Sequence, residues 1–212
     1  MLAASICATL AESGRRVAAF KPVLTGLDDP AGEWPRDHEL LASVATAGQS
    51  PHEVSPLRFG PPVSPHHAAE LASTQIEPLE LARRARESAE AADLLVCEGV
   101  GGLMVPLARG YLVRDLALDV GMPVIVAARP GLGTINHSLL TVEAARTAGL
   151  DVRAVVFTPW PESPGDLEES NRRTVEAIGQ VPVAVLPSTQ PDPAALAGAG
   201  RQLPLDDWLA AG

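Results

Sequence analysis

Short apolar runs of strand length alternate with helical segments along almost the whole chain, and this alternation limits the choice of fold. The predicted strands are residues 16–20, 94–97, 123–128, 152–157 and 183–186. The predicted helices are residues 2–12, 78–92, 113–120 and 167–178, with further helices that begin at Asp37 and after residue 133. Strands alternating with helices are typical of a parallel sheet. We therefore predict an α/β fold, with residues 1–212 forming one domain around a doubly wound, mostly parallel sheet covered by helices on both faces.

Composition narrows the class of protein. The net charge is -10 without a basic run, which argues against nucleic acid or an anionic membrane surface as a partner. No apolar run reaches the roughly 18 residues of a membrane span. Two cysteines far apart, Cys7 and Cys97, are typical of reduced thiols in a cytoplasmic protein without a disulfide or zinc site. Proline-rich patches at residues 51–65, 159–164 and 187–193 are predicted to be loops.

One strand ends in a pattern that suits a ligand. The predicted strand 94–97, which we expect to be buried, is followed by Glu98 and by glycines at 99, 101 and 102. Ligands of open α/β sheets lie beyond the carboxyl ends of the strands. An acid next to a backbone without side chains suits a hard cation and the phosphates that it bridges. The alternative is a solvated glutamate that opens a glycine-rich turn.

Two charged residues can join Glu98 at this edge. Lys21 follows the strand 16–20, is the only lysine among 16 basic residues, and is level with Glu98 if the two strands are parallel. A compact ammonium on a flexible stem can follow a phosphate that moves. Asp37 opens a helix, where it is either the N-cap or a second carboxylate for a cation. Spacing alone does not decide between these roles.

Two further segments offer polar groups. The turn before the helix near residue 134 contains glycines, and Thr134 or Asn136 can cap that helix, whose free N–H groups can hold a carboxylate. Capping without any ligand is the alternative. The adjacent histidines His66 and His67 make a poor chelate, because neighbours on a helix point about 100° apart. We assign them to loop and helix-start packing.

Four blocks of sequence, taken in order, resemble dethiobiotin synthetase. They are residues 21–26 (Lys-Pro-Val-Leu-Thr-Gly), 64–70 (Ser-Pro-His-His-Ala-Ala-Glu), 98–107 and 132–141, which contains Gly-Thr-Ile-Asn-His. The resemblance implies an enzyme of biotin synthesis that needs ATP and Mg2+. Such an enzyme closes a cyclic urea on 7,8-diaminononanoate. One amine captures CO2 (supplied by bicarbonate) as a carbamate, ATP phosphorylates the carbamate, and the second amine displaces phosphate.

The resemblance also implies roles for individual residues. Lys21 resembles the catalytic lysine, and Thr25 resembles the hydroxyl near the diamine. Asp37 and Glu98 resemble the carboxylate ligands of Mg2+, both at the nucleotide site. Gly99, Val100 and Gly101 resemble the residues that lie along the nucleotide. The family is a homodimer with its substrate site at the interface, where Gly133 and Asn136 resemble the residues that reach the diamine's carboxylate from the neighbouring subunit.

At the nucleotide base, the chain departs from the family's pattern. Thr158 stands where the family usually has an asparagine that reads adenine, and Pro159 follows it. One hydroxyl discriminates less than an amide, so we expect weaker selection of ATP over other triphosphates. By resemblance, the residues that close over the base are Pro187, Ser188 and Thr189.

A second departure is at the start of the sequence. The family begins with a strand and a glycine-rich P-loop, whereas these 212 residues begin where the following helix is under way. We expect that a mis-assigned start, such as an internal GTG codon read as Met1, omits roughly 15 residues. The predicted consequences are an unfilled gap in the sheet and little ATP turnover. One alternative is a truncated, non-catalytic dimer that still holds the diamino acid. Another is a cobyrinate-synthetase-like domain, but the sequence block at 132–141 argues against it.

Overall fold

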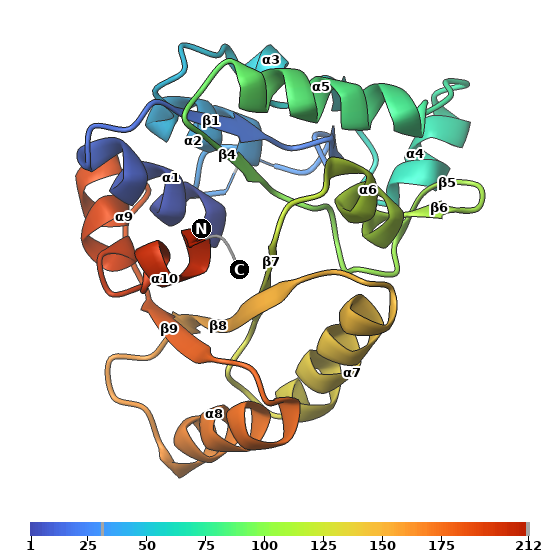
Figure 1. Cartoon of the computed structure of the whole chain (residues 1–212). Helices are drawn as coiled ribbons and strands as arrows, with labels where there is room; N and C mark the ends of the chain where they lie inside the picture. The colour runs from blue at the N-terminus through green and yellow to red at the C-terminus, as the bar shows by residue number, and fades with distance from the viewer. Residues whose placement is uncertain (31, 211–212) are drawn as a thin grey trace.

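The computed structural model describes residues 1–30 and 32–210 and contains two parallel sheets (Figure 1). One sheet pairs β1 with β4, and the other has the order β7-β8-β9. The strands are β1 (Val17–Phe20), β4 (Leu94–Cys97), β7 (Val124–Ala128), β8 (Val152–Trp160) and β9 (Val183–Pro187). All five predicted strands are therefore present: β4 has the predicted bounds, and the other four differ from prediction only at one end.

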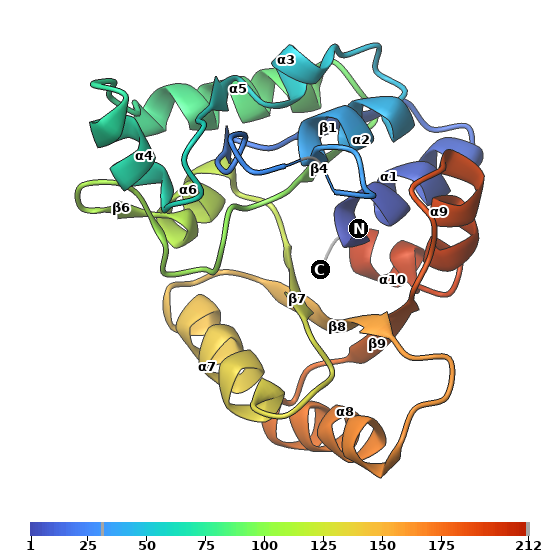
Figure 2. The same ribbon diagram turned by 180° about the vertical axis from the view of Figure 1, so that it is seen from behind.

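Helices cover both sides of these sheets, which confirms the doubly wound α/β fold. The predicted helices are found as α1 (Leu2–Glu12), α2 (Asp37–Val44), α5 (Pro78–Glu90), α6 (Val113–Val120), α7 (Thr134–Thr147) and α8 (Asp166–Gly179). On one side, α1 packs against α9 (Pro193–Gly200) and α10 (Leu205–Leu209), and their core reaches strands of both sheets. On the other side, α5 and α6 pack together, as do α7 and α8 (Figures 1 and 2).

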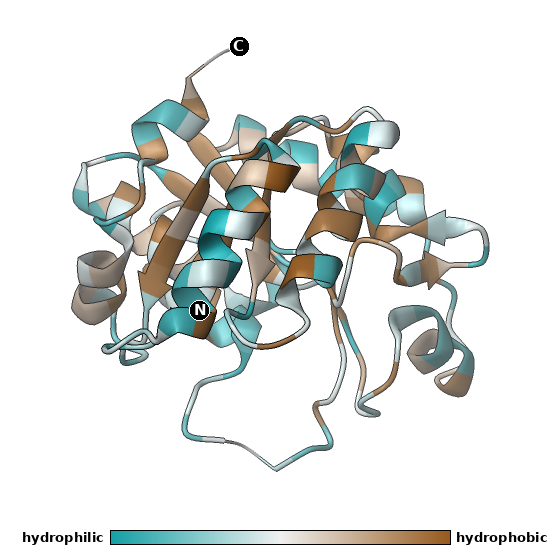
Figure 3. Cartoon of the chain, turned by 90° about the horizontal axis from the view of Figure 1, so that it is seen from below, coloured by the Kyte–Doolittle hydropathy of each residue, from teal (hydrophilic) through white to brown (hydrophobic). Residues whose placement is uncertain are grey.

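The central strand β8 shows why an apolar run forms these layers. Ala154 and Val156 belong to the core shared with α1 and α9, whereas Val155 and Phe157 belong to the core under α7 and α8. Successive side chains of a strand point to opposite faces, so a strand covered on both faces needs an unbroken apolar run. Figure 3 shows this pattern, with apolar strands between helices whose two faces differ in hydropathy.

Several short elements differ from the predicted loops. The proline-rich patch at 51–65 begins with a helical turn, α3 (Pro51–Val54), whose N-cap Ser50 accepts the N–H of Glu53 at 3.3 Å. The other short elements are β2 (Val23–Leu24), β3 (Leu57–Arg58), α4 (Pro65–Leu71), where a helix start was expected at the histidines, and the hairpin of β5 (Pro106–Ala108) and β6 (Tyr111–Leu112). The loop prediction was therefore wrong for α3, because proline at the first helical position suits a helix start.

The two sheets are separated by a cavity. Within residues 1–30 and 32–210, the facing edges of β4 and β7 pair with no strand. A cavity of about 940 Å³ lies there, lined by both strands and by the inner face of α1. This arrangement agrees with the predicted gap in the sheet. It also corrects the prediction that β4 is buried, since all four of its residues are half-buried beside the cavity.

The two cysteines and the lengths of the helices can be compared with the sequence predictions. Cys7 and Cys97 are free, and burial raises the pKa of each thiol to about 12, so both are protonated at neutral pH. In the part of the chain that the structure describes, every helix is too short or too polar to cross a membrane.

Candidate active site

A buried ammonium lies between two carboxylates at the carboxyl ends of β1 and β4. The parallel register places Phe20 opposite Cys97, so the next residues, Lys21 and Glu98, emerge side by side. Lys21 Nζ lies 2.5 Å from Glu98 Oε1 and 2.7 Å from Asp37 Oδ2. Lys21 is only 5% exposed. The structure thus brings together the three charged residues that the sequence predicted to meet.

The charge of this cluster is set by its geometry. Burial lowers the pKa of the Lys21 ammonium, but the carboxylates of Glu98 and Asp37 outweigh burial and hold that pKa above its usual value. Lys21 is therefore a cation at neutral pH. It can donate hydrogen bonds to an anion but is not a general base.

Asp37 is not the N-cap of its helix. Arg36 occupies the N-cap position, and Glu39 accepts the backbone N–H of Arg36 at 3.2 Å. Asp37 is the first residue of α2, and its carboxylate is consequently free to contact Lys21. The capping interpretation was wrong because the helix begins at Asp37 itself, one residue earlier than a cap at Asp37 requires.

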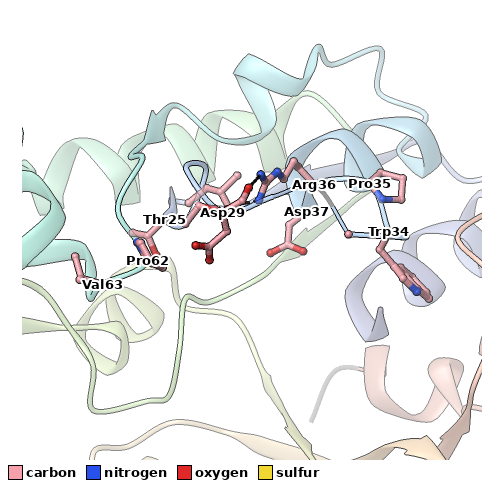
Figure 4. Close-up of a pocket in the computed structure, with 11 residues that line it drawn as sticks. Thr25, Asp29, Trp34, Pro35, Arg36, Asp37, Pro62 and Val63 are labelled. Atoms are coloured by element: carbon pink, nitrogen blue, oxygen red, sulfur yellow. Dashed lines mark hydrogen bonds between the residues drawn. The ribbon is translucent and has the colours of Figure 1, made fainter.

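A pocket of about 410 Å³ opens beside Asp37 (Figure 4). Thr25 lies on its wall, and the carboxylates of Asp29 and Asp37 point the same way into it. Arg36 fixes the wall, because its guanidinium donates to the carbonyls of Gly26 at 3.0 Å, Leu27 at 3.2 Å and Asp29. Arg36 and Asp29 were not predicted from the sequence. Their closeness to Asp37 along the chain was the only signal that could have pointed to them.

The glycine-rich loop after β4 exposes backbone toward the large cavity. Gly99 and Gly101 line that cavity together with Lys21 and Glu98. Gly101 has φ +66°, and a Cβ there would lie 2.9 Å from Val105 Cγ2, so only glycine fits. Val100 packs instead against the core under α5. The backbone, rather than side chains, is thus presented to a ligand.

The far wall of the cavity comes from the end of β8. Thr158 and Pro159 line it, and Thr158 Oγ1 is buried without a hydrogen-bond partner among the residues that the structure describes. Pro187 lies opposite Trp160 in the β8–β9 register, with Ser188 and Thr189 next in the chain. The structure does not place these last three residues on the cavity wall.

The start of α7 lies apart from this cluster. Gly133, with φ +90°, is the N-cap, and within the described chain no side chain caps the helix. The predicted caps are wrong, because the Thr134 hydroxyl pairs with Ser138 Oγ at 3.2 Å and Asn136 is exposed. Gly133 and Asn136 are both exposed and outside the cavity. Within one chain they do not meet Lys21.

The adjacent histidines do not form a metal site in this structure. Across the described ranges, no group of three or more His, Cys, Asp or Glu side chains is placed to hold a metal ion. His66 Nδ1 instead lies 3.0 Å from Ser64 Oγ, and His67 Nδ1 lies 3.1 Å from Glu70 Oε2. These contacts agree with the predicted packing at the start of α4.

Comparison with known proteins identifies relatives over most of the chain. A family model described as an AAA domain matches residues 3–191. The ATP-dependent dethiobiotin synthetase BioD of Bacillus subtilis (strain 168) is 30% identical over 183 residues, which cover 86% of this chain and 78% of the relative. BioD of Mycobacterium avium (strain 104) is 39% identical, over 83% of this chain and 75% of the relative. BioD of Novosphingobium aromaticivorans is 40% identical, over 76% of this chain and 70% of the relative.

Proposed function

Because the chain belongs to the dethiobiotin synthetase family, it is an ATP-dependent ligase of biotin biosynthesis, and we propose the roles that its residues play in that reaction. Its substrates are ATP and 7,8-diaminononanoate. CO2 is the proposed third substrate. One amine attacks CO2 and loses a proton to give a carbamate, and the γ-phosphoryl group of ATP passes to a carbamate oxygen. ADP is released in that transfer, and the second amine then displaces phosphate, loses a proton and closes the cyclic urea.

Lys21 is the proposed catalytic residue. Negative charge develops on the phosphoryl group as it moves from ATP to the carbamate, and a fixed cation lowers the energy of that state. Lys21 is buried, positively charged and held by two carboxylates 2.5 and 2.7 Å away. Its stem can reorient the ammonium as the phosphoryl group is transferred.

Asp37 and Glu98 are the proposed ligands of Mg2+. Their carboxylates already converge on one cation, the ammonium of Lys21. Mg2+ is usually held by one or two carboxylates together with water and phosphate oxygens, so this donor set fits. When bound, Mg2+ neutralises charge on the phosphates of ATP. Asp37 and Glu98 would be the residues that hold it.

The remaining residues are proposed to bind the two organic substrates. Thr25 is proposed to contact the diamine, and its position in the pocket beside Asp37 supports this role. Gly99 and Gly101 line the cavity together with Lys21, and these two glycines are proposed to run along the nucleotide with Val100 between them. At the base, the unpartnered hydroxyl of Thr158 supports a contact with adenine. The other residues proposed near the base are Pro159, Pro187, Ser188 and Thr189.

A homodimer would bring in the residues that one chain leaves apart. Gly133 and Asn136 are proposed to bind the carboxylate of the diamino acid held by the neighbouring subunit. They lie in an exposed region that also carries two apolar side chains, Leu132 at 92% and Leu140 at 57% exposure. Large exposed apolar side chains around a binding residue favour an interface there.

The cluster of Lys21, Asp37 and Glu98 carries this proposal, and its removal tests it. The chain is incubated with ATP, Mg2+, radiolabelled bicarbonate and diaminononanoate, with protein in excess because low turnover is predicted. We expect labelled dethiobiotin that depends on ATP. Lys21→Ala should lower the rate by about a hundredfold or more. The matched control is Arg201→Ala. It removes an exposed cation that pairs with Glu12, and neither residue lines the cavity.

Three results would contradict the proposal. The first is ATP-dependent product that Lys21→Ala leaves unchanged. The second is an equal loss in the Arg201 control. The third is no product from the unchanged chain even at single turnover, which would favour a binding protein of the same fold.

A further inference from the structure

The loop that leads into α7 is held by a side chain from the next helix. Asn171 on α8 is only 5% exposed, and its Nδ2 donates to the carbonyl of Pro130 at 2.8 Å and to that of Gly131 at 3.2 Å. The carbonyl of Gly131 also accepts the backbone N–H of Thr134 at 3.2 Å. One buried amide therefore connects α8 to the first turn of α7.

Between these anchors the loop is exposed. Leu132 is 92% exposed, and Gly133 adopts a left-handed conformation that allows the chain to turn into the helix. A Cβ on Gly133 would find its nearest heavy atom, in the His137 ring, only at 3.9 Å, so side-chain packing holds this residue weakly. Hydrogen bonds from Asn171 thus hold the two carbonyls that precede the first turn of α7.

We propose that Asn171 is a positioning residue for substrate binding. It fixes residues 130–133 so that Asn136 and the start of α7 meet the carboxylate of the diamino acid. This inference rests on the proposed function, in which Gly133 and Asn136 bind that carboxylate in the neighbouring subunit's site. Asn171 touches no substrate, and it acts on the other subunit by holding a loop in place.

Two ligands separate this role from a general effect on stability. The first is 7,8-diaminononanoate, and the second is 2,3-diaminononane, which has a methyl group in place of the carboxylate. Binding of each to the full chain is measured by calorimetry. Asn171→Ala should weaken binding of the diamino acid by about tenfold, the effect of losing hydrogen bonds to a binding loop. Binding of 2,3-diaminononane should not change.

Two more variants keep the test independent of folding. Asn171→Asp has nearly the same shape but cannot donate when ionised, so it should show the same selective loss. Val175→Ala is the control, because Val175 is fully buried on the same helix and belongs to the core instead of the loop contact. It should lower the melting temperature and leave both affinities unchanged.

The inference is overturned if neither Asn171 variant weakens binding of the diamino acid, or if both ligands lose affinity equally. Asn136→Ala separates this failure from failure of the proposed function. If Asn136→Ala weakens only the diamino acid and the Asn171 variants do not, the positioning role alone is wrong. If Asn136→Ala has no effect, the carboxylate binds elsewhere and both proposals fall.

Discussion

At the scale of single residues, the cluster around Lys21 is unusual in its balance of charge. Two carboxylates surround one ammonium, so the group carries a formal charge of -1; Lys21 is buried, whereas the side chains of Glu98 and Asp37 are 27% and 48% exposed. Taking the ammonium of Lys21 out of water is costly, and replacing a buried charge and its partner with apolar residues is often neutral or stabilising. Packing alone therefore gives no reason to hold these three residues together. Their excess negative charge is what a divalent cation would neutralise.

Thr158 leads to a prediction about nucleotide choice. Its hydroxyl is buried at the cavity wall without a partner among the described residues, and it offers one group to a base where an amide offers two. We expect the chain to bind ATP, GTP and CTP with affinities within about tenfold of one another, and Thr158→Asn to raise the preference for ATP by about tenfold. Calorimetry with the three triphosphates measures both ratios.

The matched control for this prediction is Thr158→Val, which keeps the shape and removes the hydroxyl. It should weaken all three triphosphates to a similar degree, since it leaves no group to read the base. A chain that already prefers ATP by far more than tenfold, or an asparagine variant with unchanged ratios, would show that Thr158 does not face the base.

At the scale of elements, α1 and α9 are packed so closely that the position of Gly200 has no room for a side chain. A Cβ on Gly200 would lie 2.6 Å from the carbonyl oxygen of Ser5 and closer still to Thr9 Oγ1. The Thr9 hydroxyl also donates to the carbonyls of Ser5 at 2.8 Å and Ala197 at 3.2 Å, which ties the helices together. Gly200→Ala should therefore destabilise the fold by about 1–3 kcal/mol, the usual cost of overpacking. Urea unfolding followed by circular dichroism measures this change.

Gly198→Ala in the same helix is the control. Its Cβ would meet only the end of the flexible Arg201 side chain, at 3.5 Å. Alanine there should be neutral or stabilise the helix by up to about 1 kcal/mol, because alanine is the better helix former. Equal effects of the two substitutions would contradict the close packing of α1 on α9.

The elements that could be predicted from the sequence are those with a clear local period. Strands such as β4 and amphipathic helices such as α5 fall within a residue or two of their predicted bounds. Neither α9 nor α10 was predicted. The Ala- and Gly-rich sequence of α9 has no polar face, because much of it is buried against α1. Its helical state depends on tertiary packing, which a local pattern does not contain.

At the scale of the whole molecule, the sequence located half of the candidate site. The carboxyl ends of adjacent parallel strands must meet, so the contact of Lys21 with Glu98 follows once both strands are recognised. The position of Gly133 and Asn136 could not be derived in this way. They follow β7, which the cavity separates from β4, and no local pattern gives the distance across it. The proposed site is therefore complete only if a second copy supplies these residues.

This dependence on a second copy gives a prediction for assembly. Leu132 and Leu140 flank Asn136 and are 92% and 57% exposed in the single chain. If they are covered in a dimer, Leu132→Gln with Leu140→Gln should weaken self-association by roughly tenfold or more, since buried apolar anchors dominate interface energies. The diamino acid should bind more weakly in proportion to the dimer lost. Sedimentation velocity over a range of protein concentrations measures the first effect, and calorimetry the second.

Leu79→Gln is the matched control, because the 72% exposure of Leu79 lies between those of Leu132 and Leu140, but Leu79 is on α5, which packs with α6 on the other sheet. It should change neither association nor binding. A chain that sediments as a monomer at every concentration and still binds the diamino acid would contradict the shared site. A dimer that the two leucine substitutions leave intact would place the interface elsewhere, and Gly133 and Asn136 would then need a ligand within their own subunit.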